Sequence, residues 1–233
     1  MNAPASELKH DLKHELKYPR DVRFWIAVAV LLAASAAFAF IAGSVATTAP
    51  ILKQDLQVSV WLHTHGSPVF SAFLLAITQM HSTLGIAVLT LIVVIYLWQH
   101  GDRYWVLSLL LTVPGGMLVN VIVKHIYHRA RPTWDDPFLT LSSASFPSGH
   151  AAAATLFYGF LAVYMVWRMK KPLPRALAVL ACTLMVAIVG FSRIYLGVHY
   201  LSDVLAAVSL GTAWLVLCII FVRQIAKRRA AAA

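Results

Sequence analysis

Residues 24–45 read FWIAVAVLLAASAAFAFIAGSV, a stretch of 22 residues that contains no charged side chain. An α-helix rises about 1.5 Å per residue, so this stretch would be ~33 Å long and would cross the ~30 Å hydrocarbon core of a bilayer. A helix also satisfies its own backbone hydrogen bonds, which lipid cannot do. The sequence therefore predicts a membrane-spanning helix at this position.

Similar apolar stretches recur along the rest of the chain. Of its 233 residues, 60% are hydrophobic and 12% are charged, and the mean hydropathy is +0.75; soluble domains are less apolar. A band at residues 69–80 follows a polar loop and is too short to span, so we expect an interfacial or re-entrant helix there. Five further spans are expected at about residues 84–98, 104–123, 151–167, 176–191 and 204–222. The predicted fold is an all-α integral membrane bundle of six transmembrane helices.

The distribution of charged residues predicts both the segments of the chain and the orientation of the bundle in the membrane. We expect a cytoplasmic N-terminal arm (residues 1–23), a six-span domain (24–223) and a basic cytoplasmic tail (224–233). The long polar start does not resemble a signal peptide, so the first span is expected to be retained. With both termini cytoplasmic, fourteen of the nineteen Lys and Arg residues fall inside, as the positive-inside rule requires. The net charge of +10 therefore reflects membrane anchoring, and no nucleic-acid partner is expected.

Three polar segments interrupt the apolar pattern, and all three lie at the predicted outer ends of spans. They are KHIYHRARP at residues 124–132, FPSGH at residues 146–150 and SRIYLGVHYLSD at residues 192–203. Forty-one residues separate the second segment from the third, which is enough for one span down and another back. The three segments can therefore meet on one face of the bundle. Ionisable groups are costly at membrane depth, so their presence at the ends of spans indicates a functional site.

The cations of these segments suit a phosphoryl group. Lys124 offers a point charge, while Arg131 and Arg193 offer planar forks, which can bind phosphate oxygens and the charge that develops during transfer. Ser148 is placed to cap an Ala-rich helix whose free N–H groups can bind an anion, and Gly149 lets the backbone approach closely. Together these residues predict an anion pocket.

Two histidines and one aspartate supply the remaining chemistry. His199 and Asp203 are four residues apart, so on one helical turn the carboxylate can hold the imidazole as a nucleophile. His150, at the start of the Ala-rich helix, is placed to protonate the leaving oxygen and then to act as the base for a water molecule. The pattern predicts phosphoryl transfer through a phosphohistidine.

Three other pairs of polar residues are weaker candidates: His63 with His65, Asp135 with Asp136, and His125 with His128. The first two pairs could hold a cation, but neither has further ligands at a recognisable spacing. The third pair flanks the first polar segment and could line the pocket or lie at the membrane interface. No metal and no other cofactor is expected.

The three segments resemble the motifs of the type 2 phosphatidic acid phosphatases, K-x6-RP, PSGH and SR-x5-H-x3-D, without a mismatch. The resemblance is to the bacterial membrane branch of that family and extends over about residues 20–225. It implies that His199 is the nucleophile, Asp203 its partner and His150 the acid. It also implies a phosphate pocket formed by Lys124, Arg131, Ser148, Gly149 and Arg193.

The resemblance further implies a lipid phosphatase of the bacterial cytoplasmic membrane with its active site facing outward. The substrate is left open among phosphatidylglycerol phosphate, phosphatidate and undecaprenyl pyrophosphate. The expected partners are that lipid phosphate and the surrounding membrane lipids, with no obligate protein partner. A non-catalytic anion or lipid carrier is the main alternative, but a carrier needs no His–Asp pair beside a second histidine, and the sequence lacks the inverted repeats typical of carriers.

Cysteine labelling tests the orientation. A cysteine introduced near Pro137, between the third and fourth predicted spans, should react with a membrane-impermeant thiol reagent added outside intact cells, because the positive-inside pattern places that loop outside. A cysteine near Pro172 should not react. The opposite labelling pattern would overturn the orientation.

Overall fold

The computed structural model describes residues 20–47, 50–134 and 143–232, so most of the predicted N-terminal arm lies outside the described residues. All regular elements of the described chain are helices, which confirms the all-α prediction. In chain order they are α2 (Arg20–Ala46), α3 (Ile51–Thr64), α4 (Pro68–Met80), α5 (Thr83–Gln99), α6 (Arg103–Tyr127), α7 (Gly149–Arg168), α8 (Pro172–Tyr195) and α9 (Leu201–Ala232).

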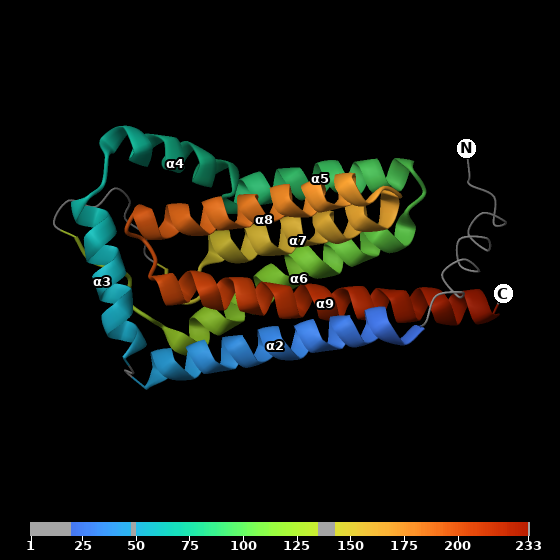
Figure 1. Cartoon of the computed structure of the whole chain (residues 1–233), viewed down its shortest axis with the longest axis horizontal. Helices are drawn as coiled ribbons and strands as arrows, with labels where there is room; N and C mark the ends of the chain where they lie inside the picture. The colour runs from blue at the N-terminus through green and yellow to red at the C-terminus, as the bar shows by residue number, and fades with distance from the viewer. Residues whose placement is uncertain (1–19, 48–49, 135–142, 233) are drawn as a thin grey trace.

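Six of these helices, α2 and α5 to α9, run side by side as a bundle (Figure 1). All but α5 are long and apolar enough to cross a membrane. α5 has 17 residues, which makes it ~25 Å long. α2 begins and α9 ends at the same end of the bundle, as an even number of crossings requires. The chain is a multi-pass membrane protein, and the predicted spans correspond to these helices.

α7 is the central helix, and small residues allow its neighbours to approach it closely. Residues 151–154 of α7, all alanine, are buried. A Cβ at Gly159 of α7 would lie 2.6 Å from the side chain of Leu215 on α9, and one at Gly211 of α9 would lie 3.1 Å from Thr155 on α7. In lipid, close packing of small residues is a main source of helix association. This packing fixes the position of α7 and of the polar segment at its start.

The segment after α2 differs from the prediction. The sequence indicated a polar loop before residue 69, but residues 51–64 form α3, which lies across one end of the bundle (Figure 1). Leu62 of α3 packs in a cluster with Tyr195 and Val204, and the polar residues Asp55 and Ser59 are also buried. Because tertiary contacts rather than a continuous apolar run stabilise this helix, its composition did not reveal it.

α4 follows α3 at an angle of 118° between the two helix axes. The expectation of a short helix at residues 69–80 is therefore confirmed, and it joins α3 in a bent pair. Leu74 and Thr78 of α4 are buried, whereas Phe70 and Phe73 are exposed. At the other end of the chain, α9 continues without a break through residues 224–232, which were predicted as a tail.

Gly85 is expected to be essential for the connection between α4 and α5. A Cβ at this position would lie 2.1 Å from the carbonyl oxygen of Met80, so Gly85→Ala must open the connection, at the ~1–3 kcal/mol typical of overpacking. Thermal unfolding in detergent micelles should show a lower Tm than the wild type. Gly43→Ala is the matched control, because the added methyl meets nothing within 4 Å and alanine favours a helix. Equal Tm values for the two variants would contradict this packing.

Candidate active site

The three polar segments meet at one end of the bundle, as predicted from the sequence. The ends of α6 and α8 and the starts of α7 and α9 lie together there (Figure 1). Backbone hydrogen bonds join the segments: the Ser148 N–H donates to the Asp203 carbonyl over 3.0 Å, and the Ser145 N–H donates to the Arg129 carbonyl over 2.8 Å. The spans thus bring residues that are up to about eighty positions apart in sequence into one cluster.

His199 lies in the turn between α8 and α9, and both of its ring nitrogens have partners. Nδ1 is 3.4 Å from Oδ2 of Asp203, and Nε2 is 3.1 Å from Nη1 of Arg131. Because a guanidinium can only donate, Nε2 is the acceptor and Nδ1 carries the proton toward the carboxylate. The sequence placed His199 and Asp203 on one helical turn, and this detail was wrong, since α9 begins only at Leu201.

Burial keeps this imidazole neutral. Only 2% of His199 is exposed. Its pKa is lowered to about 4: burial is the main cause, Arg131 and Arg193 add to it, and Asp203 opposes it. At neutral pH the ring therefore keeps the lone pair on Nε2 that an attack on phosphorus requires.

Asp203 accepts more hydrogen bonds than its pairing with His199 requires. Oδ2 accepts from the Tyr200 backbone N–H over 2.9 Å and from the Ser145 hydroxyl. Oδ1 accepts from Nη1 of Arg129 over 2.7 Å. A fully buried carboxylate is costly unless it is paired, and these donors compensate for its burial.

Two of the predicted phosphate-binding cations are held by backbone carbonyls. Nζ of Lys124 donates to the Ala144 carbonyl over 2.6 Å. Arg131 donates through Nε to the Ser143 carbonyl over 2.8 Å and through Nη1 to the Val198 carbonyl over 2.7 Å. A carbonyl positions a cation without neutralising its charge, so both charges remain available to an anion.

Arg193 is the third predicted cation and is 98% buried, with 2% of its surface exposed. Its Nη1 donates to the Thr78 hydroxyl of α4 over 2.9 Å. Its Nε has no hydrogen-bond partner among the residues that the structure describes. A buried donor of this kind needs an acceptor, and a phosphoryl oxygen would supply one. Thr78 itself was not predicted, and it connects α4 to the site.

The start of α7 faces Lys124. Ser148 is the N-cap residue, as predicted, and its hydroxyl accepts from the Ala151 N–H over 3.5 Å. A Cβ at Gly149 would lie 3.9 Å from Oδ1 of Asn120 and 4.0 Å from Cε of Lys124. The backbone at Gly149 is therefore close to a cation and to a buried amide, which suits an anion at the start of the helix.

His150 is the second residue of α7 and is partly buried. Its ring lies within electrostatic range of His199, Arg193 and Arg131. The two histidines predicted to act in sequence therefore share one cluster with two of the cations. An acid at this position can act only if the leaving oxygen is bound beside it.

Other candidates from the sequence have different surroundings. The rings of His63 and Trp134 stack with their centroids 4.1 Å apart. His65 lies on the exposed side of the end of α3, and His125 and His128 are exposed near the end of α6. Because His125 and His128 are on the surface, the structure favours a position at the membrane interface for this pair over a position in the pocket.

Within the part of the chain that the structure describes, no group of three or more His, Cys, Asp or Glu side chains is placed to hold a metal ion. Asp135 and Asp136, the acidic pair considered from the sequence, lie outside the described residues. The carboxylate of Asp203 in the cluster at His199 already accepts hydrogen bonds from Arg129, Ser145 and Tyr200, and the remaining groups include the cations Lys124, Arg131 and Arg193, which are not metal ligands. Its chemistry suits a phosphate.

Arg129 and Asp55 belong to the cluster but were not predicted. Arg129 lies inside the first polar segment, at a position that its motif leaves free, and it forms ion pairs with both Asp203 and Asp55. One sequence signal could have indicated Asp55: no other acidic residue occurs between Asp21 and Asp102. An isolated carboxylate beside membrane spans requires a partner.

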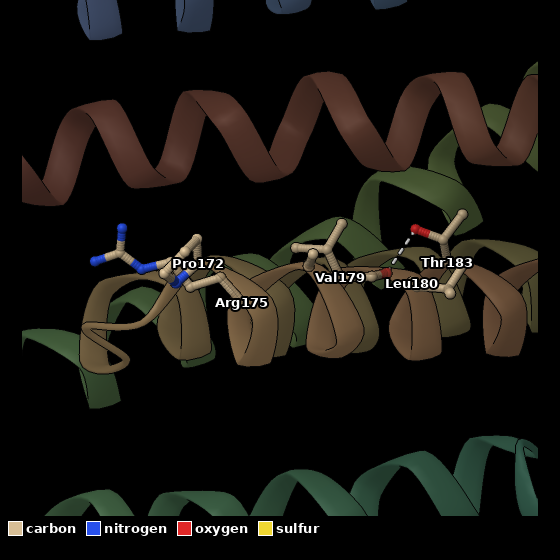
Figure 2. A pocket seen from close by; sticks show the side chains of 6 residues that line it. Pro172, Arg175, Val179, Leu180 and Thr183 are labelled. Atoms are coloured by element: carbon tan, nitrogen blue, oxygen red, sulfur yellow. Dashed lines mark hydrogen bonds between the residues drawn. The ribbon is translucent and has the colours of Figure 1, made fainter.

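The groove on α8 lies away from this cluster. It has a volume of about 590 Å³ and is lined by Pro172, Arg175, Ala176, Val179, Leu180 and Thr183. Figure 2 shows these side chains on the first turns of α8, where the Thr183 hydroxyl donates to the Val179 carbonyl. Arg193 follows eighteen residues after Arg175, which is ~27 Å along the helix. The groove is an apolar surface of the bundle.

Comparison with known proteins identifies relatives of this chain. Phosphatidylglycerophosphatase B of Bacillus subtilis is 36% identical over 110 residues, which cover 45% of this chain and 52% of that protein. Decaprenylphosphoryl-5-phosphoribose phosphatase of Mycobacterium tuberculosis H37Rv is 37% identical over 98 residues, which cover 40% of this chain and 48% of that protein. The chain spans about half the length of these curated relatives.

Two crystal structures are similar to most of this chain. The transmembrane PAP2-type phosphatidylglycerolphosphate phosphatase of Bacillus subtilis has a TM-score of 0.73 and 26% identity, with 85% of this chain and 96% of that chain covered. Aquifex aeolicus LpxE has a TM-score of 0.56 and 21% identity, with 71% and 94% covered, and supports the fold alone. The family model of the PAP2 superfamily matches residues 104–227, which contain all three polar segments. The chain belongs to the PAP2 superfamily.

Proposed function

We propose that this protein is a lipid phosphatase that transfers a phosphoryl group from a lipid phosphate first to Nε2 of His199 and then to water. The observation that carries this proposal is the geometry of the buried His199 imidazole, with Asp203 at Nδ1 and the Arg131 guanidinium at Nε2. An attacking nitrogen that already lies beside a phosphate-binding cation is close to where a bound phosphoryl group would sit.

In the first step, Nε2 of His199 attacks phosphorus and the bond between phosphorus and the lipid oxygen breaks. Arg131 exchanges its contact with Nε2 for a phosphoryl oxygen, and Lys124 and Arg193 bind the other oxygens. These cations stabilise the charge that develops on the phosphoryl group. His150 donates its proton to the leaving oxygen, and the lipid alcohol departs.

In the second step, water attacks the phosphorus of the phosphohistidine. His150, now neutral, accepts a proton from that water, the bond between phosphorus and Nε2 breaks, and inorganic phosphate is released. Asp203 stabilises the positive charge that His199 carries between the two steps. The cycle consumes one water molecule and uses no metal ion.

The substrate that we propose is a phosphomonoester of a membrane lipid, and phosphatidylglycerol phosphate is the first candidate. The two curated relatives are named as a phosphatidylglycerophosphatase and a decaprenylphosphoryl-5-phosphoribose phosphatase, and the more similar solved structure is named as a phosphatidylglycerolphosphate phosphatase. Phosphatidate carries the same phosphomonoester group directly on diacylglycerol, without the additional glycerol phosphate unit. Undecaprenyl pyrophosphate would require space for a second phosphate beside the three cations.

We place the site at the outer leaflet of a bacterial cytoplasmic membrane, with both termini cytoplasmic. The distribution of Lys and Arg supports this orientation. Lipid tails would then lie among the helices while the phosphate reaches the polar ends of α6 to α9. No nucleic acid and no obligate protein partner is needed for this reaction.

Phosphate release from purified lipids in excess EDTA tests this function. The purified protein should release phosphate from phosphatidylglycerol phosphate faster than from phosphatidate or undecaprenyl pyrophosphate, and EDTA should not change the rate, because cations of the protein itself bind the phosphate. Loss of activity in EDTA with restoration by magnesium would refute the metal-free mechanism. Faster release from the pyrophosphate would refute the substrate class.

The two histidines should respond differently to the leaving group. His199→Ala should abolish turnover of every substrate, because no nucleophile remains. His150→Ala should slow lipid hydrolysis by about 10²–10⁴-fold, the contribution typical of a general acid. An aryl phosphate, whose leaving oxygen needs little protonation, should partly rescue His150→Ala, as measured by release of the aryl alcohol.

His199→Ala is the control for this rescue, since an aryl phosphate cannot replace a nucleophile. Asp203→Asn should retain phosphate binding but lower kcat, because the imidazole loses both its orientation and its compensating charge. Rescue of His199→Ala by the aryl phosphate, together with no rescue of His150→Ala, would reverse the two assignments.

A further inference from the structure

Arg129 joins two buried carboxylates from distant parts of the chain. Its Nη2 is 2.8 Å from Oδ2 of Asp55 on α3, and its Nη1 is 2.7 Å from Oδ1 of Asp203 on α9. Each carboxylate is 74 residues from Arg129 in the sequence. The guanidinium also lies 4.2 Å from the ring centroid of Tyr200. A planar fork can bridge two carboxylates in this way, whereas the point charge of a lysine cannot.

Asp55 is bonded to the start of α9 as well as to Arg129. Its Oδ1 accepts from the Ser202 backbone N–H over 2.9 Å, and its Oδ2 accepts from the Ser202 hydroxyl. Only 2% of Asp55 is exposed. It lies in α3, before residues 104–227, which the family model matches. A helix outside the matched region thus supplies a charge to the site.

These charges depend on one another because they are buried. A buried ion is stable only with well-placed partners, and the loss of one partner leaves the other uncompensated. Burial alone would lower the pKa of Arg129, but Asp203 and Asp55 raise it above its ordinary value. The guanidinium therefore stays charged between the two carboxylates, and its position is fixed from both sides.

We propose that Asp55 and Arg129 are positioning residues for the reaction at His199. Asp55 holds Arg129, Arg129 holds Oδ1 of Asp203, and Oδ2 of Asp203 then faces Nδ1 of His199. This inference rests on the proposed role of His199 as the nucleophile. It assigns to α3 a task in the chemistry as well as in the fold.

Asp55 has a second effect on the attack of His199 on phosphorus, because Asp55 and Asp203 both pair with Arg129. His199 becomes positively charged when Nε2 bonds to phosphorus, and Asp203 stabilises that charge. Arg129 opposes this stabilisation, since it is a cation bonded to the same carboxylate. Because Asp55 shares Arg129, it leaves more of the negative charge of Asp203 for His199.

Steady-state kinetics on Asp55→Asn test the proposal. This variant keeps the size of the side chain but removes its charge, and kcat should fall by roughly 10–100-fold, the range known for partners that orient a functional group in metal sites. KM and inhibition by vanadate should stay within about twofold of the wild type, because Lys124, Arg131 and Arg193 are untouched. A loosened structure would weaken phosphate binding as well.

The second measurement asks whether Asp55 acts through Asp203. In an Asp203→Asn background, the further change Asp55→Asn should lower kcat by less than about twofold, since residues that act as one unit are not additive. Phosphate release by the wild type and its loss in His199→Ala report on the proposed function. The role of Asp55 is tested separately, by the fall in kcat that Asp55→Asn causes in the wild type compared with the fall that it causes in Asp203→Asn.

Two further variants control for folding. Asp102→Asn removes a carboxylate that accepts a hydrogen bond from the Tyr164 hydroxyl over 2.8 Å at the opposite end of the bundle, and it should leave kcat unchanged. If Asp55→Asn does not fold, Arg129→Lys replaces it, because lysine keeps the charge but loses the bridge, and the same fall in kcat at constant KM is expected. The proposal would be overturned if the folded Asp55→Asn or Arg129→Lys variant had the kcat of the wild type. It would also be overturned if Asp55→Asn lowered kcat as much in the Asp203→Asn background as in the wild type.

Discussion

A carboxylate without contact with water must be compensated by the protein, and Asp203 imposes this constraint on the whole site. It is fully buried at the start of α9, and its two oxygens accept hydrogen bonds from two other parts of the chain. Arg129 and Ser145 approach from the segment between α6 and α7, and His199 approaches from the turn after α8. The helix ends must therefore meet here, because separating them would leave the charge unpaired.

The packing of the bundle makes this meeting possible. α7 lies at the centre because its alanines and glycines let α6, α8 and α9 approach, and its start then lies among their ends. The free N–H groups of α7 and the cations from α6 and α8 converge on one small volume. In our proposal, a lipid phosphate bound there keeps its tails among the spans, which would explain the position of the site at the end of a membrane bundle.

The sequence predicted what depends on local pattern. The spans followed from uninterrupted apolar runs, and the cap at Ser148 followed from its place before an Ala-rich helix. α3 was missed because Lys53 and Asp55 interrupt its apolar face, and its stability comes from contacts with α8 and α9. Arg129 and Asp55 could not be paired from the sequence, since 74 residues separate them and only the folded chain brings them together.

The central claim is that phosphorus becomes bonded to Nε2 of His199. Rapid quenching of the wild type during turnover of lipid labelled in its terminal phosphate, followed by proteolysis under alkaline conditions, tests this most directly. A phosphoramidate that is labile to acid and stable to base should be found on the peptide that contains His199. Label on a peptide without His199, or turnover at full rate with no label on the protein at any quench time, would contradict a phosphohistidine at this residue.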